Sequence, residues 1–274
     1  MKPEAIQAAF EQACLAELAA LKPGNVHIHA PGHGMIVEDF IISARVAAPH
    51  IAASGASVGA RIEAAVGATF AAVGKNTNLG ILLLCAPLAS AAELAGRAPE
   101  LRRALHHVLN SLTEADASAA FRAIVIASPA GLGRVPDHDV HAAPDITLLQ
   151  AMQHAALRDR IAYQYAHDFD DIFTLGLPAL RRHDAPWSAV AAYLAFLARF
   201  PDSHIARKHG LATADAVCKA AALLAERFAA TTMPNHLQPE LMALDEGFKR
   251  QNLNPGTSAD LTVASLFAEA LLSL

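Results

Sequence analysis

Residues 74–88 read Gly-Lys-Asn-Thr-Asn-Leu-Gly-Ile-Leu-Leu-Leu-Cys-Ala-Pro-Leu, a polar loop that runs directly into an apolar segment. The pattern predicts a helix from about Asn78 to Gly96 that is apolar on most faces, and such a helix belongs at the centre of a domain. Unpaired N–H groups and a partial positive charge at its N-terminus favour phosphate or another anion. We therefore expect substrate to contact Gly74, Lys75, Asn76, Thr77 and Asn78.

Helical periodicity also dominates the rest of the 274 residues. Further helices are predicted over residues 5–21, 37–48, 58–73, 99–110, 113–127, 146–173, 187–200, 213–230, 238–251 and 258–272. A long loop rich in Gly, Pro, Asp and His is expected over residues 128–144, and loops of this length are often functional. No two-residue alternation or hairpin signal indicates strands, and no composition break divides the chain. The prediction is an all-α fold in a single compact multi-helix domain spanning residues 1–274.

The composition limits the kind of partner this protein has. Hydrophobic residues make up 54% and charged residues only 17%, which indicates a large buried fraction or an oligomer interface, so a homodimer is plausible. The net charge of −5 argues against nucleic-acid binding. The longest apolar run is too short to span a membrane, and no basic amphipathic stretch suits a membrane surface.

The cellular compartment is predicted from the N-terminus and the cysteines. No apolar signal segment follows Met1, because the chain enters an amphipathic pattern at once. Cys14, Cys85 and Cys218 are far apart in apolar contexts and are expected to be reduced core residues. We therefore expect a cytoplasmic protein.

A histidine-rich loop follows the first predicted helix. It carries His27, His29 and His33 between Pro and Gly residues. Such a trio can hold zinc, but the paired histidines of metallohydrolases end a strand, and none is predicted here. Histidines in a Pro/Gly loop more often face solvent or bond to backbone. We expect a single functional histidine, with His33 favoured as a catalytic residue.

Three carboxylates are candidate metal ligands, because hard cations such as Mg²⁺ take carboxylate oxygens and keep waters for phosphates. Asp39 opens a predicted helix, where a carboxylate also stabilises the helix dipole. Glu63 is an isolated charge in an Ala/Val-rich helix. Asp260 lies in the first turn of the helix that starts within residues 254–261, where Thr257 or Ser258 is the expected N-cap, and it could hold a metal or accept a proton. Gly256, in the same helix start, is expected to contact substrate.

Residues 201–210 place a carboxylate, a hydroxyl and two adjacent cations close together. Arg207 and Lys208 precede a glycine, so they could simply decorate a helix C-terminus. They could equally clamp a polyphosphate, which Arg binds as a fork and Lys as a point charge.

The order of these motifs resembles the triphosphoribosyl-dephospho-CoA synthase family from Lys22 to about Leu266. The most specific blocks are Gly-x-Asn-Thr-x-x-Gly at residues 74–80 and Pro-Gly-x-x-Ala-Asp-Leu at residues 255–261. The resemblance implies an all-helical enzyme of cofactor biosynthesis. Such an enzyme joins the triphosphoribosyl part of ATP to a ribose hydroxyl of 3′-dephospho-CoA and releases adenine.

The resemblance also suggests roles for the candidate residues. Lys22, Arg207 and Lys208 would contact phosphates, and Asn76 and Thr77 would hold phosphate or ribose oxygens. Asp39, Glu63 and Asp260 would coordinate magnesium. Asp202 or Asp260 would act as the base that deprotonates the acceptor hydroxyl.

The loop departs from the family pattern, which usually reads Gly-Val-Asn-Thr-His-Lys-Gly. Here Lys75 replaces Val, Asn78 replaces His and Leu79 replaces Lys. This predicts a divergent branch whose acceptor is dephospho-CoA or a related cofactor precursor.

Two other functions are open on the sequence. The first is a metal-dependent helical hydrolase of nucleotides or ADP-ribose-like ligands, which the adjacent His167 and Asp168 also suggest. The second is a helical protein that binds nucleotide without catalysis.

Overall fold

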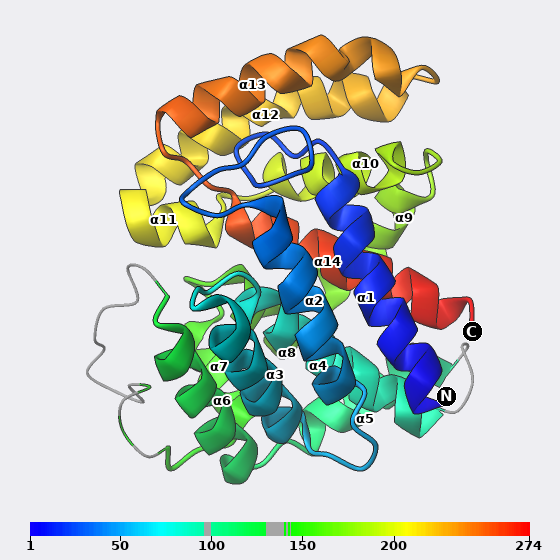
Figure 1. The fold of residues 1–274 in the computed structure, drawn as a ribbon, viewed down its shortest axis with the longest axis vertical. Helices are drawn as coiled ribbons and strands as arrows, with labels where there is room; N and C mark the ends of the chain where they lie inside the picture. The colour runs from blue at the N-terminus through cyan, green and yellow to red at the C-terminus, as the bar shows by residue number, and fades with distance from the viewer. Residues whose placement is uncertain (96–99, 130–139, 141, 143) are drawn as a thin grey trace.

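The computed structural model describes residues 1–95, 100–129, 140, 142 and 144–274. Within these residues the chain forms fourteen α-helices, a π-helical turn and a 3₁₀ turn (Figure 1). The described β-structure is limited to two isolated bridges in the histidine-rich loop. The prediction of an all-α fold in one compact multi-helix domain is confirmed.

The first half of the chain supplies the helices α1 (Pro3–Ala19), α2 (Val37–Ile51), α3 (Val58–Val73), α4 (Leu79–Ala95), α5 (Leu101–Asn110) and α6 (Glu114–Ala127). The second half supplies α7 (Leu148–Ala155), α8 (Arg160–Ala166), η2 (Ile172–Gly176), α9 (Leu177–Leu180), α10 (Trp187–Leu197), α11 (Ser203–His209), α12 (Leu211–Ala230), η3 (Pro234–Leu237), α13 (Gln238–Arg250) and α14 (Gly256–Leu272). Most predicted helices are therefore present within a few residues of their expected ends.

Helix α4 is central, as its apolar sequence predicts. Its side chains from Ile81 to Ala89 are all buried. Helix α14 is the second central helix and packs against α1, α4 and α10. In Figure 1, α14 crosses the middle of the molecule, with α12 and α13 above it and α3 to α8 below. The N-termini of α4 and α14 thereby come close together.

The hydrophobic residues form two clusters on either side of this middle layer. The larger one joins α1 to α8 with most of α14, and in it Phe10 meets Phe267 edge to face. The smaller one joins α10, α12 and α13. Both are rich in Ala, Leu, Ile and Val, in line with the aliphatic composition.

Local sequence explains where several helices begin and end. The side chains of Ser57, Thr113 and Thr147 accept N-terminal N–H groups of α3, α6 and α7. Gly74 ends α3 in the left-handed region with a φ of 65°, which glycine adopts at low cost. This turn starts the polar loop that leads to α4.

Two predictions about the helices are wrong, and one helix was missed. The single helix expected over residues 146–173 is interrupted, because Asp159 caps a new helix and Asp168 and Phe169 take positive φ values. Helix α11 was not expected as a separate helix. Helix α14 begins at Gly256, so Thr257 and Ser258 lie inside it and do not act as its N-cap.

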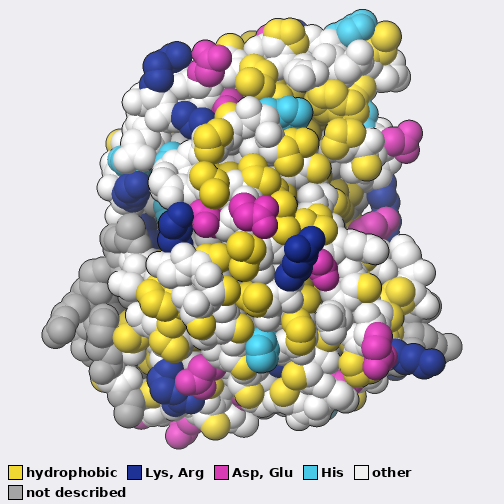
Figure 2. Space-filling model, in the orientation of Figure 1, with side chains coloured by type: hydrophobic (Ala, Val, Ile, Leu, Met, Phe, Trp, Pro, Cys, Tyr) yellow, Lys and Arg dark blue, Asp and Glu magenta, His cyan; other side chains and the backbone are white. Residues whose placement is uncertain are grey.

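The predicted loop at residues 128–144 lies mostly outside the described residues. In the part of the chain that the structure describes, no helix combines the length and apolarity needed to cross a membrane. On the face shown in Figure 2, positive and negative side chains are interspersed among apolar ones and do not gather in one basic patch.

Candidate functional site

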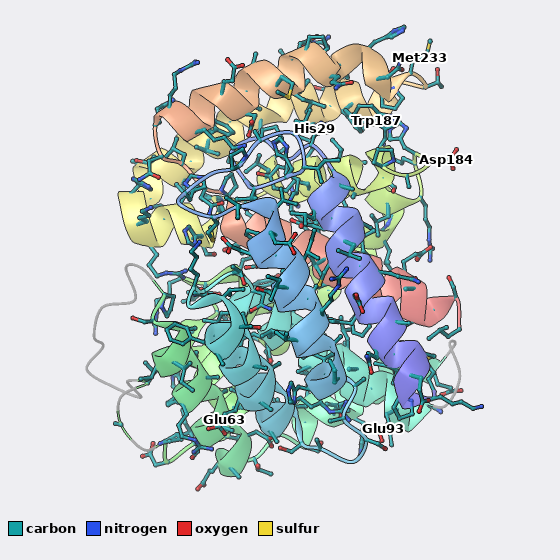
Figure 3. The ribbon with its side chains drawn as sticks, in the orientation of Figure 1. His29, Glu63, Glu93, Asp184, Trp187 and Met233 are labelled. Atoms are coloured by element: carbon teal, nitrogen blue, oxygen red, sulfur yellow. The ribbon has the colours of Figure 1, made fainter. Side chains whose placement is uncertain are left out.

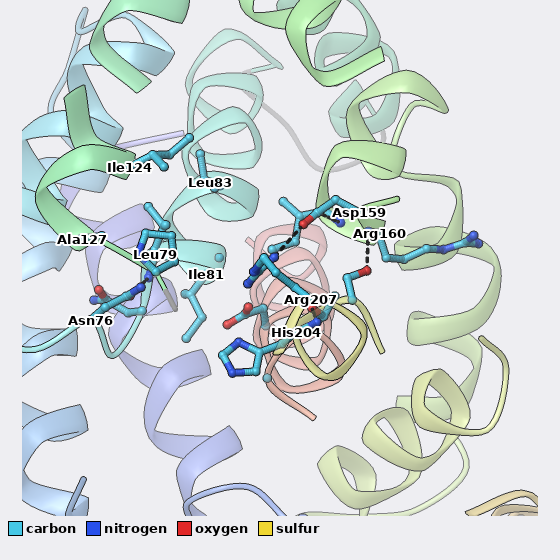
Figure 4. Close-up of a pocket in the computed structure, with 18 of the residues that line it drawn as sticks. Asn76, Leu79, Ile81, Leu83, Ile124, Ala127, Asp159, Arg160, His204 and Arg207 are labelled. Carbon is cyan, nitrogen blue, oxygen red and sulfur yellow. Dashed lines mark hydrogen bonds and ion pairs between the residues drawn. The ribbon is translucent and has the colours of Figure 1, made fainter. Parts of the chain in front are cut away.

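A cavity of about 1250 Å³ opens where the N-termini of α4, α8, α11 and α14 come together. Its polar wall consists of loop 74–78, the start of α8, helix α11 and the start of α14. Its apolar wall consists of side chains from α4, α6 and α7, namely Leu79, Ile81, Leu83, Ile124, Ala127, Leu148 and Met152. In Figure 4 Leu83 and Ile124 lie on one side and Asp159 and Arg207 on the other, while Asn76 of the loop lies on the side of Leu79 and Ala127.

Loop 74–78 lines the cavity as predicted, but its side chains bond to the protein itself. The Asn76 side chain accepts the N–H of Leu79 at 3.2 Å, so it caps the start of α4. The hydroxyls of Thr77 and Ser43 lie 2.6 Å apart. Asn78 donates to Thr69 at 3.1 Å. These bonds fix the loop, and all five of its residues line the cavity.

Lys75 joins this loop to helix α2. Its ammonium group lies 2.8 Å from the Asp39 carboxylate, which also accepts the N–H of Ile36 at 3.0 Å. The hydrogen bond from Lys75 lowers the pKa of Asp39 below its usual value. Lys75 lines the cavity, whereas Asp39 is committed to this pair and to the N-terminus of α2.

Helix α11 brings the two predicted cations to the opposite side. Arg207 donates to Asp159 at 3.2 Å, and the side chains of both are about a quarter exposed. Lys208 is exposed, lines the cavity and makes no hydrogen bond or ion pair with any described residue. Its charge is therefore available to an anionic ligand.

His204, on the same helix, lines the cavity and packs against Gly256, the first residue of α14. Burial lowers the pKa of His204 to about 4, and the nearby charges of Arg207 and Lys208 act in the same direction. The imidazole is therefore neutral at pH 7. A side chain at Gly256 would press on this ring, because its Cβ would lie 3.3 Å from His204 Cγ.

Asp260 is the carboxylate that the structure leaves unpaired in the cavity. It makes no hydrogen bond or ion pair within the described part of the chain. Burial raises its pKa well above the usual range, and the negative charges of Asp202, Glu17 and Asp159 raise it further. A cation or a proton bound here would relieve this repulsion.

The lack of a side chain at Gly80 leaves room for the Asp260 carboxylate. A Cβ at position 80 would overlap the Asp260 carboxylate and would lie 2.7 Å from Ile161 Cδ1. The absence of a side chain therefore lets the carboxylate lie against the first turn of α4.

Asp202, the other predicted base, is fully buried and is not among the residues that line the cavity. One oxygen accepts the N–H groups of His204 and Ile205, and the other accepts the N–H and hydroxyl of Ser258. Burial raises its pKa, and these hydrogen bonds oppose that shift. This single carboxylate caps both α11 and α14, so its observed role is to hold the two helices together.

Lys22, a predicted phosphate contact, is also buried. Its ammonium group forms an ion pair with Glu17 and donates to Asn25 at 3.1 Å and to the Val26 carbonyl at 2.7 Å. Burial lowers the pKa of Lys22 and raises that of Glu17. Glu17 and Asn25 line the cavity, whereas Lys22 does not. Lys22 therefore holds two lining side chains in position.

The rings of His27 and His29 lie 5.6 Å apart, but among the described residues the three histidines of residues 27–33 do not form a metal-binding group. His27 is buried beside Asp245, at 3.4 Å, whereas His29 is exposed in the upper loop of Figure 3. His33 lines the cavity, and its ring nitrogens lie 2.7 Å from the Gly24 carbonyl and 3.0 Å from the Asn252 side chain. His33 therefore bridges two loops at the edge of the site.

The three predicted metal ligands are not brought together either. Glu63 lies near the lower end of the molecule in Figure 3, where Arg122 binds it as a fork at 2.6 and 2.7 Å. This pairing lowers the pKa of Glu63. Among the described residues, no three His, Cys, Asp or Glu side chains lie close enough to hold a metal ion by themselves.

The lining residues that were missed from the sequence include Glu17, Asp159, Arg160 and His204. Asp159 and Arg160 lie in the middle of the predicted 146–173 helix, so no loop signal pointed to them. His204 lies between two residues that were singled out, and its apolar neighbour Ile205 gave no reason to expect a ligand contact.

The fold and the cavity define an all-helical protein whose site suits a phosphorylated ligand, with cations on one wall and a free carboxylate beside them. The chain belongs to the ATP:dephospho-CoA triphosphoribosyl transferase family (CitG), whose family model matches residues 3–274. The predicted family is thereby confirmed, and the chain is a transferase.

A solved structure supports the same assignment. The chain is similar to a protein from Archaeoglobus fulgidus assigned provisionally as a triphosphoribosyl-dephospho-CoA synthase. The TM-score is 0.66 with 25% sequence identity, over 82% of this chain and 95% of that chain. No curated protein matches the chain significantly. The family assignment does not favour the hydrolase or the non-catalytic binding protein.

Proposed function

We propose that this protein transfers the triphosphoribosyl group of ATP to a ribose hydroxyl of dephospho-CoA and releases adenine. The observation that carries the proposal is the unpaired Asp260 carboxylate in a cavity that also presents Lys208 and Arg207. The family assignment supplies the two substrates.

The reaction breaks the bond between ribose C1′ of ATP and adenine, and it forms a bond from C1′ to the acceptor oxygen. The sugar passes through a cation-like state that a nearby carboxylate stabilises. Asp260 would accept the proton of the acceptor hydroxyl, and adenine would take up a proton as it leaves. The raised pKa of Asp260 suits a group that binds a proton during turnover.

The triphosphate would lie along helix α11. Lys208 and Arg207 would bind its oxygens, and the N-terminus of α4 would favour negative charge. In nucleotide sites Mg²⁺ uses one or two carboxylates together with substrate phosphates, so Asp260 would fit as a protein ligand in a state in which it is ionised and not holding the proton. Such an ion would neutralise charge on the triphosphate. Asp39 and Glu63 are left out of this proposal, because neither is among the residues that line the cavity and each is paired with a cation, Lys75 or Arg122.

The test is to incubate the protein with ATP, Mg²⁺ and 3′-dephospho-CoA, and to follow adenine release and the mass of the adduct. We expect equal amounts of adenine and triphosphoribosyl adduct. Adenine without an adduct would instead indicate hydrolysis. ATP binding without adenine release would mean that another cofactor precursor is the acceptor.

Asp260→Asn should abolish adenine release, while the thermal midpoint stays close to that of the original chain. Glu269→Gln is the matched control, because Glu269 lies on the same helix and pairs with Arg181 on the surface. An active Asp260→Asn variant would remove Asp260 from the mechanism. A homodimer and a cytoplasmic location remain predictions.

A further inference from the structure

We propose that the apolar wall of the cavity is a subsite for the pantetheine arm of the acceptor. This inference rests on the proposed function, since it takes dephospho-CoA as the acceptor. It assigns a role to the α6–α7 side of the cavity, which the chemistry at Asp260 leaves unused.

The first observation is the separation of charge across the cavity. The charged side chains that line it come from α1, loop 74–78, α11, α14 and the segment around Asp159. By contrast, the described lining residues of α6 and α7 carry no charge, and they include Phe121, Ile124 and Met152. Triphosphate and diphosphate groups therefore belong on the polar wall, and a ligand that fills the whole cavity must have a long uncharged part.

The second observation is that part of the apolar wall is open to the cavity. Leu83 and Met152 are buried, but Leu79 and Ile124 are only half-buried. Apolar side chains that remain open beside a polar site indicate a surface that a ligand covers. Covering them with methyl and methylene groups would remove apolar area from water and strengthen binding.

The apolar wall suits the pantetheine arm better than it suits adenine. Adenine needs hydrogen-bond partners for its ring nitrogens, and side chains such as Leu83, Ile124 and Met152 provide none. The pantetheine arm is a flexible chain of methylene, gem-dimethyl and amide groups without charge. Ser128 lies at the end of α6, lines the same region and offers a hydroxyl to an amide.

The experiment measures binding, so it does not depend on turnover. Isothermal titration gives Kd for dephospho-CoA and for ADP, which is dephospho-CoA without the pantetheine arm. Ile124→Asn is compared with Ile126→Asn, a substitution on the same helix at a residue that is 37% exposed and does not line the cavity. Thermal unfolding of both variants checks that they fold.

We expect Ile124→Asn to raise Kd for dephospho-CoA about tenfold and to leave Kd for ADP unchanged. Ile126→Asn should change neither value. Ile124→Ala, which only shortens the side chain, should give a smaller change in the same direction and serves if the Asn variant is unstable.

Equal weakening of ADP and dephospho-CoA would overturn the inference, because the wall would then hold adenine. Unchanged affinity for both ligands in both Ile124 variants would also overturn it. Failure of adenine release in the turnover assay would contradict the proposed reaction alone, since the Kd values report the subsite independently.

Discussion

Loop 74–78 and helix α11 face the same cavity, yet the structure uses their polar side chains differently. In the loop, Lys75, Asn76, Thr77 and Asn78 each bond to another part of the protein. On α11, Lys208 has no described partner. The loop is therefore held in place by its own side-chain bonds, whereas Lys208 on α11 and Asp260 on α14 have no described partner and could contact a ligand. Substitutions in the two regions should accordingly have different consequences.

The largest effect is expected where the two regions meet, at Gly80→Ala. The added methyl group would overlap the Asp260 carboxylate and displace it. We expect kcat to fall at least about 100-fold, because a misplaced reacting group is that costly, together with a loss of about 1–3 kcal/mol in stability. Adenine release and chemical unfolding provide the two measurements.

The matched control is Gly67→Ala, in the middle of α3. A Cβ at Gly67 would meet no atom within 4 Å, so this variant should keep full activity and gain about 1 kcal/mol in stability. If Gly80→Ala were as active as Gly67→Ala, the close approach of α4 and α14 would have no catalytic importance.

The second effect is a pH dependence that comes from α11. The unfolded His204 takes up a proton below about pH 6.5, but the folded residue does so only near its pKa of about 4. Stability should therefore fall as the pH drops from 6.5 toward 4, by about 2 kcal/mol between pH 7 and pH 5.

Urea unfolding at several pH values measures this loss. The His204→Asn variant should lack this part of it, while titrations elsewhere in the protein remain common to both chains. Parallel stability curves for the two proteins would show that His204 is not kept neutral by folding.

The third prediction concerns Lys208, the cation that has no described partner. Lys208→Ala should raise KM for ATP about tenfold and leave stability unchanged, because the ammonium bonds to the ligand and to no described residue. Steady-state kinetics with Lys219→Ala as control measure this, since Lys219 pairs with Asp215 on the surface. An unchanged KM would place the triphosphate elsewhere.

The smallest effect is expected in the braced loop. Ser43→Ala removes the partner of Thr77, and a single hydrogen bond is worth about 1 kcal/mol. We expect that loss in thermal unfolding, with a change of less than about threefold in KM for ATP. If Ser43→Ala lost more activity than Lys208→Ala, the loop side chains would matter more for the ligand than Lys208 does, contrary to the comparison above.

Much of the fold was predictable because the helices obey local rules. The apolar segment after Gly80 and the glycine that ends α3 both correspond to elements of the structure. The break near Asp159 was not predictable, since apolar periodicity continues on both sides of it. What separates α7 from α8 is the capping of Ile161 and Ala162 by Asp159, together with its contact to Arg207.

The sequence predicted which segments form the cavity better than it predicted what each of their residues does. The sequence indicated the loop, the cations and Asp260, all of which line the cavity. It could not show that Asp202 is buried, because that depends on Ser258, a partner distant in the sequence. Lys22 is also buried, although its partners Glu17, Asn25 and Val26 lie close to it in the sequence. Asp39 and Glu63 likewise had their cations on other elements, Lys75 in loop 74–78 and Arg122 on α6.

The contact between Gly80 and Asp260 also limits how this protein can change over generations. Any side chain at position 80 needs the space that the carboxylate at position 260 occupies. A relative that uses the carboxylate at position 260 is therefore expected to keep glycine at position 80. The two sites are 180 residues apart, yet they should be inherited as a pair.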